Sequence, residues 1–342
     1  MSRITIIGAG SWGTGLAIVL GRGGQHQVRL WAFEKAVAQV IRSQRVNQIF
    51  LPGFPLPEAV SVTTRMDEAL HGAEIVLTAV PSQHCRSVYE QMPGSLSPKM
   101  LFVSATKGLE GGTSARMTEV GFHAIESAPG GFQPRIGALS GPSFAREAAR
   151  GDPTAVTIAS SDAELGATVQ REFSDPNFRV YTNDDVVGVE LGGALKNIIA
   201  IAAGVCVGLG LGNNTIAALM TRGLAEITRL AVACGGRRET LAGLAGMGDL
   251  VLTCTGGLSR NRSVGVELGR GRKLPDIIAG MHGAVAEGVF TTQAAVGLAR
   301  ARGVEMPITE QMDAILHRAK APADAIRDLM SRSGKSEVAL SS

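Results

Sequence analysis

Hydrophobic residues in the first half of the chain gather in short continuous runs. The strand candidates are Ile4–Ile7, Val28–Trp31, Ile75–Val80, Leu101–Ala105, Ile136–Ser140, Ala155–Ala159 and Arg179–Tyr181, and several of them are continuous apolar runs of four to six residues. Strands that are covered on both faces are apolar throughout, so these runs predict the strands of a buried sheet. Between them lie segments with helical periodicity, namely Thr14–Arg22, Gln83–Met92, Ser114–Ile125 and Ala163–Phe173. This alternation predicts βαβ units and a mostly parallel sheet, with Leu51–Pro57 and Ser127–Pro134 as loops.

The pattern changes near residue 184, after which helical periodicity dominates. Helices are expected at Val189–Val205, Thr215–Cys234, Arg262–Gly269, Thr291–Arg302 and Ile308–Leu316. We therefore expect two domains, an α/β domain over residues 1–187 and an all-α C-terminal domain over residues 188–330. Residues 331–342 are polar and are expected to form a frayed tail.

One stretch of the second half is apolar enough to raise the question of a membrane span. Residues 198–212 form a run of 15 apolar residues or glycines. A spanning helix needs about 20 such residues, and the glycines at 204, 208, 210 and 212 weaken the case further. The run predicts a buried core helix, and we do not expect an integral membrane protein.

Composition narrows the classes of function. Among 342 residues, 33 Lys and Arg stand against 30 Asp and Glu, and a net charge of +3 gives no field for nonspecific nucleic-acid binding. Aromatic residues, at 4%, are too few for a platform that stacks bases. The four cysteines and six histidines have no metal-ligand spacing, so no metal site is expected. The first residues do not resemble a signal peptide, and the sequence predicts a cytoplasmic protein.

The glycine pattern Gly8-Ala9-Gly10-Ser11-Trp12-Gly13 follows the first predicted strand and opens the first predicted helix. Gly8 permits a tight turn, Gly10 lets a pyrophosphate approach the backbone, and Gly13 lets helix and strand pack closely. The helix N-terminus offers free N–H groups to phosphates. The pattern therefore predicts a dinucleotide-binding domain with a Rossmann-type, doubly wound sheet. It leaves open whether the dinucleotide carries a nicotinamide or a flavin.

The end of the second predicted strand bears on the choice of cofactor. It reads Trp31-Ala32-Phe33-Glu34, without Arg or Lys. An acidic residue here accepts a hydrogen bond from a ribose 2′-hydroxyl, whereas a cation holds a 2′-phosphate. Glu34 can play the first role, or it can be a solvated carboxylate at the start of the next helix.

Further candidate ligands follow other predicted strands, because sheets of this kind bind ligands at the carboxyl ends of their strands. Val80-Pro81-Ser82, Lys107 and Ser140-Gly141-Pro142-Ser143 occupy such places. Lys107 precedes a glycine and can reach an anion there, although a surface lysine fits the same pattern.

Lys196 lies in the first helix of the second half, in the segment Gly192-Gly193-Ala194-Leu195-Lys196-Asn197. Its helical neighbours are small, so another molecule can approach this face. A lysine in such apolar surroundings has a lowered pKa, which suits proton transfer near neutrality; the alternative is a lysine that extends to the surface. Asp249 precedes an apolar run and needs a partner if it is buried. It can cap a helix, hold Lys196 or hold a substrate hydroxyl.

A cluster of polar residues opens a later predicted helix. Ser259 is a candidate N-cap, and Arg260, Asn261 and Arg262 follow it. A guanidinium forms bidentate contacts with phosphate, and the helix N-terminus adds partial positive charge. The cluster therefore predicts a phosphate site, with an exposed basic helix start as the alternative.

Several of these blocks together resemble the bacterial NAD(P)-dependent sn-glycerol-3-phosphate dehydrogenases. The resemblance rests on Gly8–Thr14, Ala105–Leu109, Ser140–Ala145, Gly192–Asn197 and Gly246–Leu250, and also on Thr253–Thr255, Ser259–Arg262 and Gly303–Thr309. The blocks stand in the right order and span residues 3–316.

This resemblance implies a homodimeric enzyme that interconverts dihydroxyacetone phosphate and sn-glycerol 3-phosphate with NAD or NADP, and so supplies glycerophospholipid synthesis. It implies Lys196 as the general acid/base. The residues that it implies around the substrate are Lys107, Gly141, Ser143, Lys196, Asp249, Ser259, Arg260 and Asn261. Those that it implies around the cofactor, beside Gly8, Gly10 and Gly13, are Ser11, Trp12, Phe33, Lys107, Ala145, Arg260, Val285 and Glu287. The family often carries a basic residue or histidine at position 33, so Phe33 favours use of both cofactors with a weaker bias to NADPH.

Two other functions fit parts of the pattern. One is a different two-domain hydroxyacid or sugar-acid dehydrogenase, against which the basic cluster at Arg260–Arg262 argues. The other is a nucleotide-sensing protein without turnover, against which Lys196 argues, because a sensor needs no proton donor.

Overall fold

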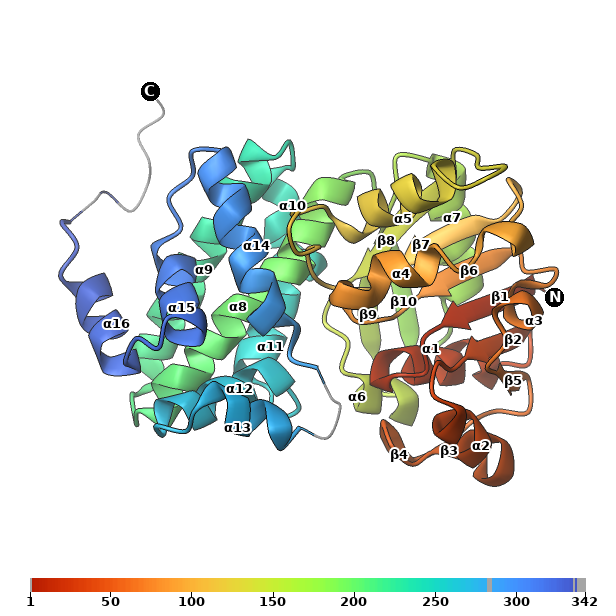
Figure 1. Ribbon diagram of the computed structural model, residues 1–342, viewed down its shortest axis with the longest axis horizontal. Coiled ribbons are helices and arrows are strands. Elements are labelled where there is room, and N and C mark those ends of the chain that lie inside the picture. Colours follow the sequence, from red (N-terminus) through yellow and green to blue (C-terminus); the bar gives the residue numbers. More distant parts are fainter. Residues whose placement is uncertain (1, 282–284, 335, 337–342) are drawn as a thin grey trace.

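A computed structural model describes residues 2–281, 285–334 and 336 of the chain. A sheet-containing domain made by the first half of the chain lies beside a helical domain made by the second half (Figure 1). The fold class expected from the sequence, a Rossmann-type α/β domain followed by an all-α domain, is confirmed.

Eight strands form the main sheet in the order β10-β9-β8-β7-β6-β1-β2-β5. Their bounds are β1 Ser2–Ile7, β2 His26–Trp31, β5 Val60–Thr63, β6 Ile75–Thr78, β7 Leu101–Ser104, β8 Arg135–Ser140, β9 Thr154–Ala159 and β10 Phe178–Asn183. All neighbours are parallel except β8 and β9. The chain leaves β1 toward β2 on one side and returns to β6 on the other. The edge between β1 and β6 is therefore the topological switch point, where sheets of this kind bind ligands.

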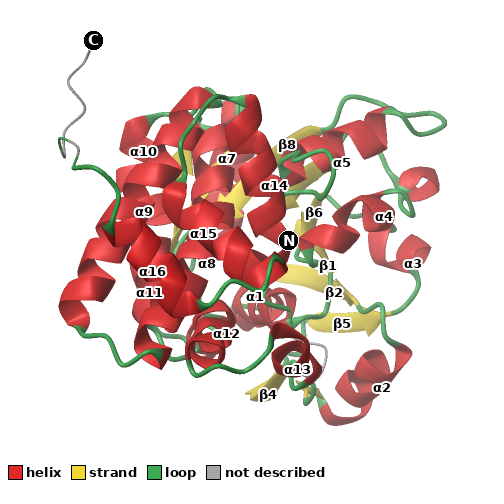
Figure 2. Ribbon diagram, turned by 60° about the vertical axis from the view of Figure 1, so that its left-hand side comes forward, coloured by secondary structure: helices red, strands yellow, loops and turns green. Residues whose placement is uncertain are grey.

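Helices cover both faces of this sheet (Figure 2). They are α1 Ser11–Arg22, α2 Lys35–Gln44, α3 Met66–Leu70, α4 Cys85–Tyr89, α5 Met117–Glu126, α6 Ala145–Arg150 and α7 Ala163–Phe173, with short 3₁₀ turns at Ser82–His84 and Pro93–Ser95. Alternate strand residues enter different cores. Leu101 and Val103 pack in one core, whereas Phe102 packs in the other. Because both faces are covered at the centre of the sheet, every residue of β6 and β7 is buried, whereas the edge strand β10 also carries exposed residues.

The second domain is built around α8, Val186–Gly208. Around it lie α9 Asn213–Ala233, α10 Arg238–Ala242, a π-helical turn Leu244–Gly248, α11 Asp249–Thr255, α12 Arg260–Gly269, α13 Leu274–Ala279, α14 Glu287–Ala301, α15 Pro307–His317 and α16 Pro322–Met330. Among the described residues, α8 is the one single helix long and apolar enough to cross a membrane, and 89% of its apolar window is buried inside the protein. It is a core helix, as expected from the sequence.

Glycines let α8 and α12 approach each other closely. A side-chain carbon at Gly204 would overlap the carbonyl of Arg262, and one at Gly265 would overlap the carbonyl of Ile201. The α8–α12 contact matters for function because α8 carries Lys196 and α12 begins at Arg260. The abundance of glycine thus serves close backbone approach in this domain.

The expectation that residues 51–57 form a loop is wrong for most of that segment. Leu51–Pro55 is strand β4, which pairs antiparallel with β3, Val46–Asn47. In a two-stranded sheet each strand has one edge without a partner strand. Pro52 and Pro55 have no backbone N–H, and a strand with an unpaired edge tolerates the loss of these donors. Two further expected helices begin or end elsewhere. The helix expected at Gln83–Met92 is a 3₁₀ turn followed by α4, and that at Ser114–Ile125 begins later, at Met117.

Gly204→Ala is expected to destabilise the second domain. The added methyl group has to push α8 and α12 apart, and overpacking of this kind costs about 1–3 kcal/mol. The unfolding midpoint in urea should fall. Gly94→Ala is the matched control, because nothing lies within 4 Å of the added carbon there. Equal midpoints for the Gly204 variant and wild type would contradict the packing argument.

Candidate active site

A cavity of about 660 Å³ opens at the carboxyl edge of the sheet and faces the helical domain. The sheet domain contributes segments that follow five strands, namely Gly8–Trp12 after β1, Trp31, Phe33 and Glu34 at β2, Ala79–Pro81 after β6, Ala105–Lys107 after β7, and Ser143–Arg146 after β8. The helical domain contributes Lys196, Asn197, Asp249, Thr253, Leu258–Asn261, Val285 and Glu287. The cavity thus lies at the switch point of the sheet, where the glycine motif predicts a dinucleotide.

The glycine turn has the geometry that the sequence motif predicts. Gly8 has φ +116°, a conformation that favours glycine. A side-chain carbon at Gly13 would overlap the carbonyl of Gly8, so only glycine lets α1 begin so close to the strand. Nothing lies within 4 Å of the corresponding place at Gly10, so the backbone is open to the cavity there. An N-terminus of α1 that is open in this way fits the diphosphate of a dinucleotide.

The end of β2 offers no cation to this part of the cavity. Phe33 is 71% exposed, and both Phe33 and Glu34 line the cavity. Glu34 stands at the N-cap of α2, but its carboxylate accepts no capping hydrogen bond. Arg29 is engaged elsewhere, because its guanidinium donates to the carbonyls of Glu68 and His71. The role of Glu34 toward a ribose hydroxyl stays a prediction.

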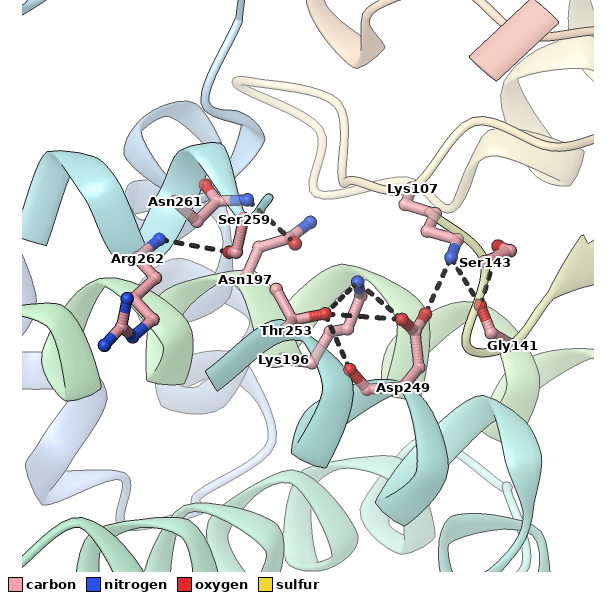
Figure 3. Close-up of polar contacts among 10 residues, drawn as sticks. All are labelled: Lys107, Gly141, Ser143, Lys196, Asn197, Asp249, Thr253, Ser259, Asn261 and Arg262. Atoms are coloured by element: carbon pink, nitrogen blue, oxygen red, sulfur yellow. Dashed lines mark hydrogen bonds and ion pairs between the residues drawn. The ribbon is translucent and has the colours of Figure 1, made fainter. Parts of the chain in front are cut away.

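Two lysines from different domains share one buried carboxylate (Figure 3). Lys196 Nζ lies 2.8 Å from Asp249 Oδ1, and Lys107 Nζ lies 2.7 Å from Asp249 Oδ2. Lys196 is 5% exposed and Asp249 is 1% exposed. Burial lowers the pKa of Lys196 to about 8, and the positive charge of Lys107 contributes, while the carboxylate of Asp249 opposes the shift.

These positions decide between the alternative roles that the sequence leaves open for the two lysines and for Asp249. Lys196 does not extend to the surface, and Lys107 is half-buried and ion-paired rather than a surface lysine. Asp249 is the first residue of α11 and holds both lysines, so it is not a helix cap. The preceding turn, Leu244–Gly248, is π-helical. Turns of this kind are frequent at functional sites, and this one delivers Asp249 to α8.

Thr253 belongs to the same group, although sequence reasoning gave it no role. Its hydroxyl accepts a hydrogen bond from Lys196 Nζ at 2.7 Å and donates to the carbonyl of Asp249 at 2.6 Å. Thr253 lies four residues after Asp249, so both share one face of α11. That spacing is the signal that identifies it. Lys196 therefore has two fixed oxygen partners that hold its ammonium group in place.

Gly141 and Ser143 act on the other side of Lys107. The carbonyl of Gly141 accepts from Lys107 Nζ and from Ser143 Oγ, each at 2.9 Å. Gly141 has φ +136°, which favours glycine, and its carbonyl is turned toward the lysine. Ser143 and Lys107 line the cavity, whereas Gly141 does not line it and supports these two side chains through its carbonyl.

The start of α12 forms a polar wall of the cavity. Ser259 is its N-cap, as expected, and accepts from the backbone N–H of Arg262 at 3.2 Å. Ser259, Arg260 and Asn261 line the cavity. Arg262 does not, and its side chain points away from the lysines (Figure 3). The sequence placed it in the phosphate cluster, but one residue further along a helix turns a side chain by about 100°.

Asn197 is a second residue that sequence reasoning did not select. Asn261 Nδ2 donates to Asn197 Oδ1 at 3.0 Å, while Asn261 Oδ1 accepts from the N–H of Gly288 at 2.9 Å. This relay fixes the orientation of the Asn197 amide. Asn197 Nδ2 has no partner within the described part of the chain and lines the cavity, so it is a donor for a ligand. Its place directly after Lys196 is the only signal in the sequence.

Glu287, at the start of α14, joins the two domains beside the cavity. Its carboxylate accepts from Ser82 Oγ at 2.6 Å and from the N–H of Ser82 at 3.3 Å. Burial raises the pKa of Glu287, and the hydrogen bonds from Ser82 and the charge of Arg260 oppose that rise. Val285 and Ala145 line the cavity as well.

Within residues 2–281, 285–334 and 336, no group of three or more His, Cys, Asp or Glu side chains could hold a metal ion.

The fold and the cavity together define a two-domain oxidoreductase of the dinucleotide-dependent class. Family models described as the N-terminus and C-terminus of NAD-dependent glycerol-3-phosphate dehydrogenase match residues 3–166 and 185–327. The chain belongs to this family of NAD(P)-dependent oxidoreductases, and NAD or NADP is its cofactor.

Individual relatives agree along almost the whole chain. It is 66% identical to the glycerol-3-phosphate dehydrogenase [NAD(P)+] of Koribacter versatilis over 338 residues, which is 99% of each chain. It is 55% identical to that of Acidobacterium capsulatum, over 98% of this chain and all of the relative. The crystal structure of glycerol-3-phosphate dehydrogenase from Coxiella burnetii superposes with a TM-score of 0.90 at 40% identity, covering 97% of this chain and 99% of the other.

Lys196→Met should leave the fold and dinucleotide binding intact and lower kcat by about 10²–10⁴, the usual worth of a general acid/base. With Lys196 as the expected general acid, reduction of the ketone substrate requires its ammonium form. Its kcat/KM should therefore fall as pH rises through about 8, and that of the reverse oxidation should fall as pH drops through the same value. Rate–pH profiles in both directions measure this. A Met variant with wild-type kcat would remove Lys196 from the mechanism.

Proposed function

We propose that this protein catalyses the reversible reduction of dihydroxyacetone phosphate to sn-glycerol 3-phosphate by NADH or NADPH. The observation that carries the proposal is the buried Lys196, with a pKa of about 8, in the same cavity as the glycine turn. The relatives and the solved structure reported above are named for this activity.

When bound, the nicotinamide cofactor would supply the hydride that the ketone carbon accepts in the reducing direction. Negative charge then develops on the ketone oxygen, and Lys196 stabilises it and donates its proton there. Asp249 and Thr253 hold the ammonium group and limit its movement. In the reverse direction, neutral Lys196 takes the proton from the hydroxyl group. Lys107 supplies a second fixed positive charge across Asp249.

The phosphate of the substrate is assigned to the start of α12. Arg260 donates to it, and Ser259, Asn261 and the free amide donors of Asn197 complete the subsite. Lys107 and Ser143 are assigned to the opposite side of the substrate site, where the carbonyl of Gly141 holds both of them in place. Contacts remote from the reacting carbon convert binding energy into orientation, so they raise the rate as well as the affinity. This phosphate subsite favours the present function over that of a hydroxyacid dehydrogenase that acts on unphosphorylated substrates.

The cofactor is assigned to the glycine turn, with its diphosphate at Gly10, Ser11 and Trp12 and its adenosine toward Phe33. Ala145, Lys107, Arg260, Val285 and Glu287 complete its surroundings. The protein is further proposed to be a cytoplasmic homodimer that supplies glycerophospholipid synthesis. The dimer and the metabolic role rest on the resemblance to the family, and the cytoplasmic location rests on the four cysteines without a disulfide pattern.

The direct test follows NADH and NADPH oxidation at 340 nm with and without dihydroxyacetone phosphate. Oxidation should depend on this substrate, and unphosphorylated dihydroxyacetone should be a poor replacement. Cofactor binding without turnover would favour a nucleotide-sensing protein. Equal activity with an unphosphorylated hydroxyacid would favour the other dehydrogenases.

Arg260→Ala should raise KM for dihydroxyacetone phosphate at least tenfold. A hydrogen bond to a charged group contributes about 1.5–3 kcal/mol, and the variant loses it. Unphosphorylated dihydroxyacetone, assayed at high concentration, should be little affected. Arg262→Ala is the matched control, because its side chain points away from the cavity. Losses of equal size for both substrates would show that Arg260 does not recognise the phosphate.

Phe33→Arg should shift kcat/KM toward NADPH by about 1–2 kcal/mol, the worth of a charge-assisted contact. No Arg or Lys follows β2 within the cavity, and a 2′-phosphate beside Glu34 meets repulsion. The wild type is therefore expected to use both cofactors. The measurement is kcat/KM for NADH and NADPH in both proteins. A hundredfold preference of the wild type for NADPH, unchanged in the variant, would refute the argument from the end of β2.

A further inference from the structure

An arginine outside the motifs discussed so far lies on the wall of the cavity. Arg146 is the second residue of α6 and lines the cavity together with Ser11 and Trp12. It is exposed, and it has no hydrogen bond or ion pair with any residue that the structure describes. Its guanidinium carbon lies 5.9 Å from the centre of the Phe54 ring. The guanidinium group is therefore free to bind an anion in the cavity.

The packing of α6 places Arg146 at the phosphate-binding end of α1. At the start of α6, the backbone of Ala145 lies 3.2–3.4 Å from where a side-chain carbon of Gly15 would stand. At its end, the carbonyls of Ala148 and Ala149 accept from Arg22, the last residue of α1. The two helices thus run side by side in the same direction. Arg146 is consequently near the first turn of α1 rather than its last.

The β3–β4 hairpin fixes this arrangement from a second side. Asn47 Nδ2 donates to the carbonyl of Ala9 at 2.8 Å and to Thr14 Oγ1 at 2.9 Å. The carbonyl of Phe50 accepts from Ser11 Oγ at 2.6 Å. Phe54 belongs to the same hairpin, on β4. The ring that supports Arg146 is therefore tied to the glycine turn itself.

Arg146 differs from the other cations of the cavity in its lack of a charged partner and in its position. The Lys and Arg residues that line it are Lys107, Arg146, Lys196 and Arg260. Both lysines are paired with Asp249, and Arg260 interacts with the charge of Glu287. Arg260 has no ion pair either, but it begins α12 in the helical domain, so within the described ranges Arg146 is the unpaired cation that the sheet domain contributes to the cavity. A dinucleotide diphosphate brings two negative charges to the end of α1, where the helix supplies only about half a positive charge.

We propose that Arg146 binds the diphosphate of the nicotinamide cofactor, opposite the N-terminus of α1. The guanidinium group stays on Phe54 and donates to the phosphate oxygens, so it serves NADH and NADPH alike. The inference rests on the proposed placement of the cofactor. It adds a cofactor-binding residue that acts on affinity and leaves the hydride and proton transfers to other groups.

The test compares Arg146→Ala with Arg150→Ala in the full-length protein. Arg150 is exposed on the last turn of the same helix, where it pairs with Asp152 away from the cavity. The dissociation constants of NADH, NADPH and ADP-ribose are measured by fluorescence or calorimetric titration. For Arg146→Ala, all three should rise at least about fivefold, since a charge-assisted contact is lost. The dissociation constants of Arg146→Lys should lie between those of the wild type and of Arg146→Ala. Those of Arg150→Ala should equal the wild-type values.

Saturating cofactor should restore the kcat of Arg146→Ala and its KM for dihydroxyacetone phosphate. A loss of affinity for NADPH alone would overturn the proposal, because it would mean that Arg146 contacts the 2′-phosphate rather than the diphosphate. Unchanged dissociation constants would overturn it as well. An equal unfolding midpoint for Arg146→Ala and wild type shows that any loss is local. Because binding is read directly, a wild type that binds NADH without reducing dihydroxyacetone phosphate refutes the proposed function and leaves this result valid.

Discussion

The ion network of Lys107, Asp249 and Lys196 is the interaction on which the rest of the site depends. Its three members come from the end of β7, from α11 and from α8, and so from both domains. Asp249 is almost fully buried. A carboxylate in such a place is stable only while it is paired, and removal of one partner of a buried pair costs about 3–5 kcal/mol. The network therefore fixes the mutual position of the domains at the point where the chemistry takes place.

Other contacts across the domain boundary also hold the two domains together. Glu190 on α8 accepts from the N–H and hydroxyl groups of Thr118 and from Arg116, at the start of α5. Burial raises the pKa of Glu190, while the charge of Arg116 and the hydrogen bonds from Thr118 oppose that rise. Glu287 makes a similar bridge to Ser82 on the other side of the cavity. Carboxylates of the helical domain thus satisfy free N–H groups of the sheet domain, and the cavity lies between these anchors.

The sequence predicted those parts of the structure that depend on local pattern. All seven strand candidates are strands, and the glycine turn follows from the positive φ of Gly8 and the close packing at Gly13. The β3–β4 hairpin was missed because two short strands at an edge leave little periodicity, and prolines argue against strands. Thr253 and Asn197 were missed for another reason. Their roles come from partners 57 and 64 residues away in the chain, and the only local signals are their positions next to Asp249 on α11 and next to Lys196 on α8.

The lowered pKa of Lys196 reflects a balance that neither burial nor pairing alone would give. Burial in the small-residue face of α8 and the charge of Lys107 favour the neutral amine, whereas Asp249 favours the ammonium ion. With full burial and no carboxylate, the pKa of the lysine would be lower still, and less of the ammonium form would be present near neutral pH to donate a proton. With the carboxylate but without burial, it would hold its proton too firmly to return it to solvent or to accept one from an alcohol. The proposed role of Lys196 as acid and base in a reversible reaction requires both forms near neutral pH, and burial together with the shared carboxylate makes both accessible.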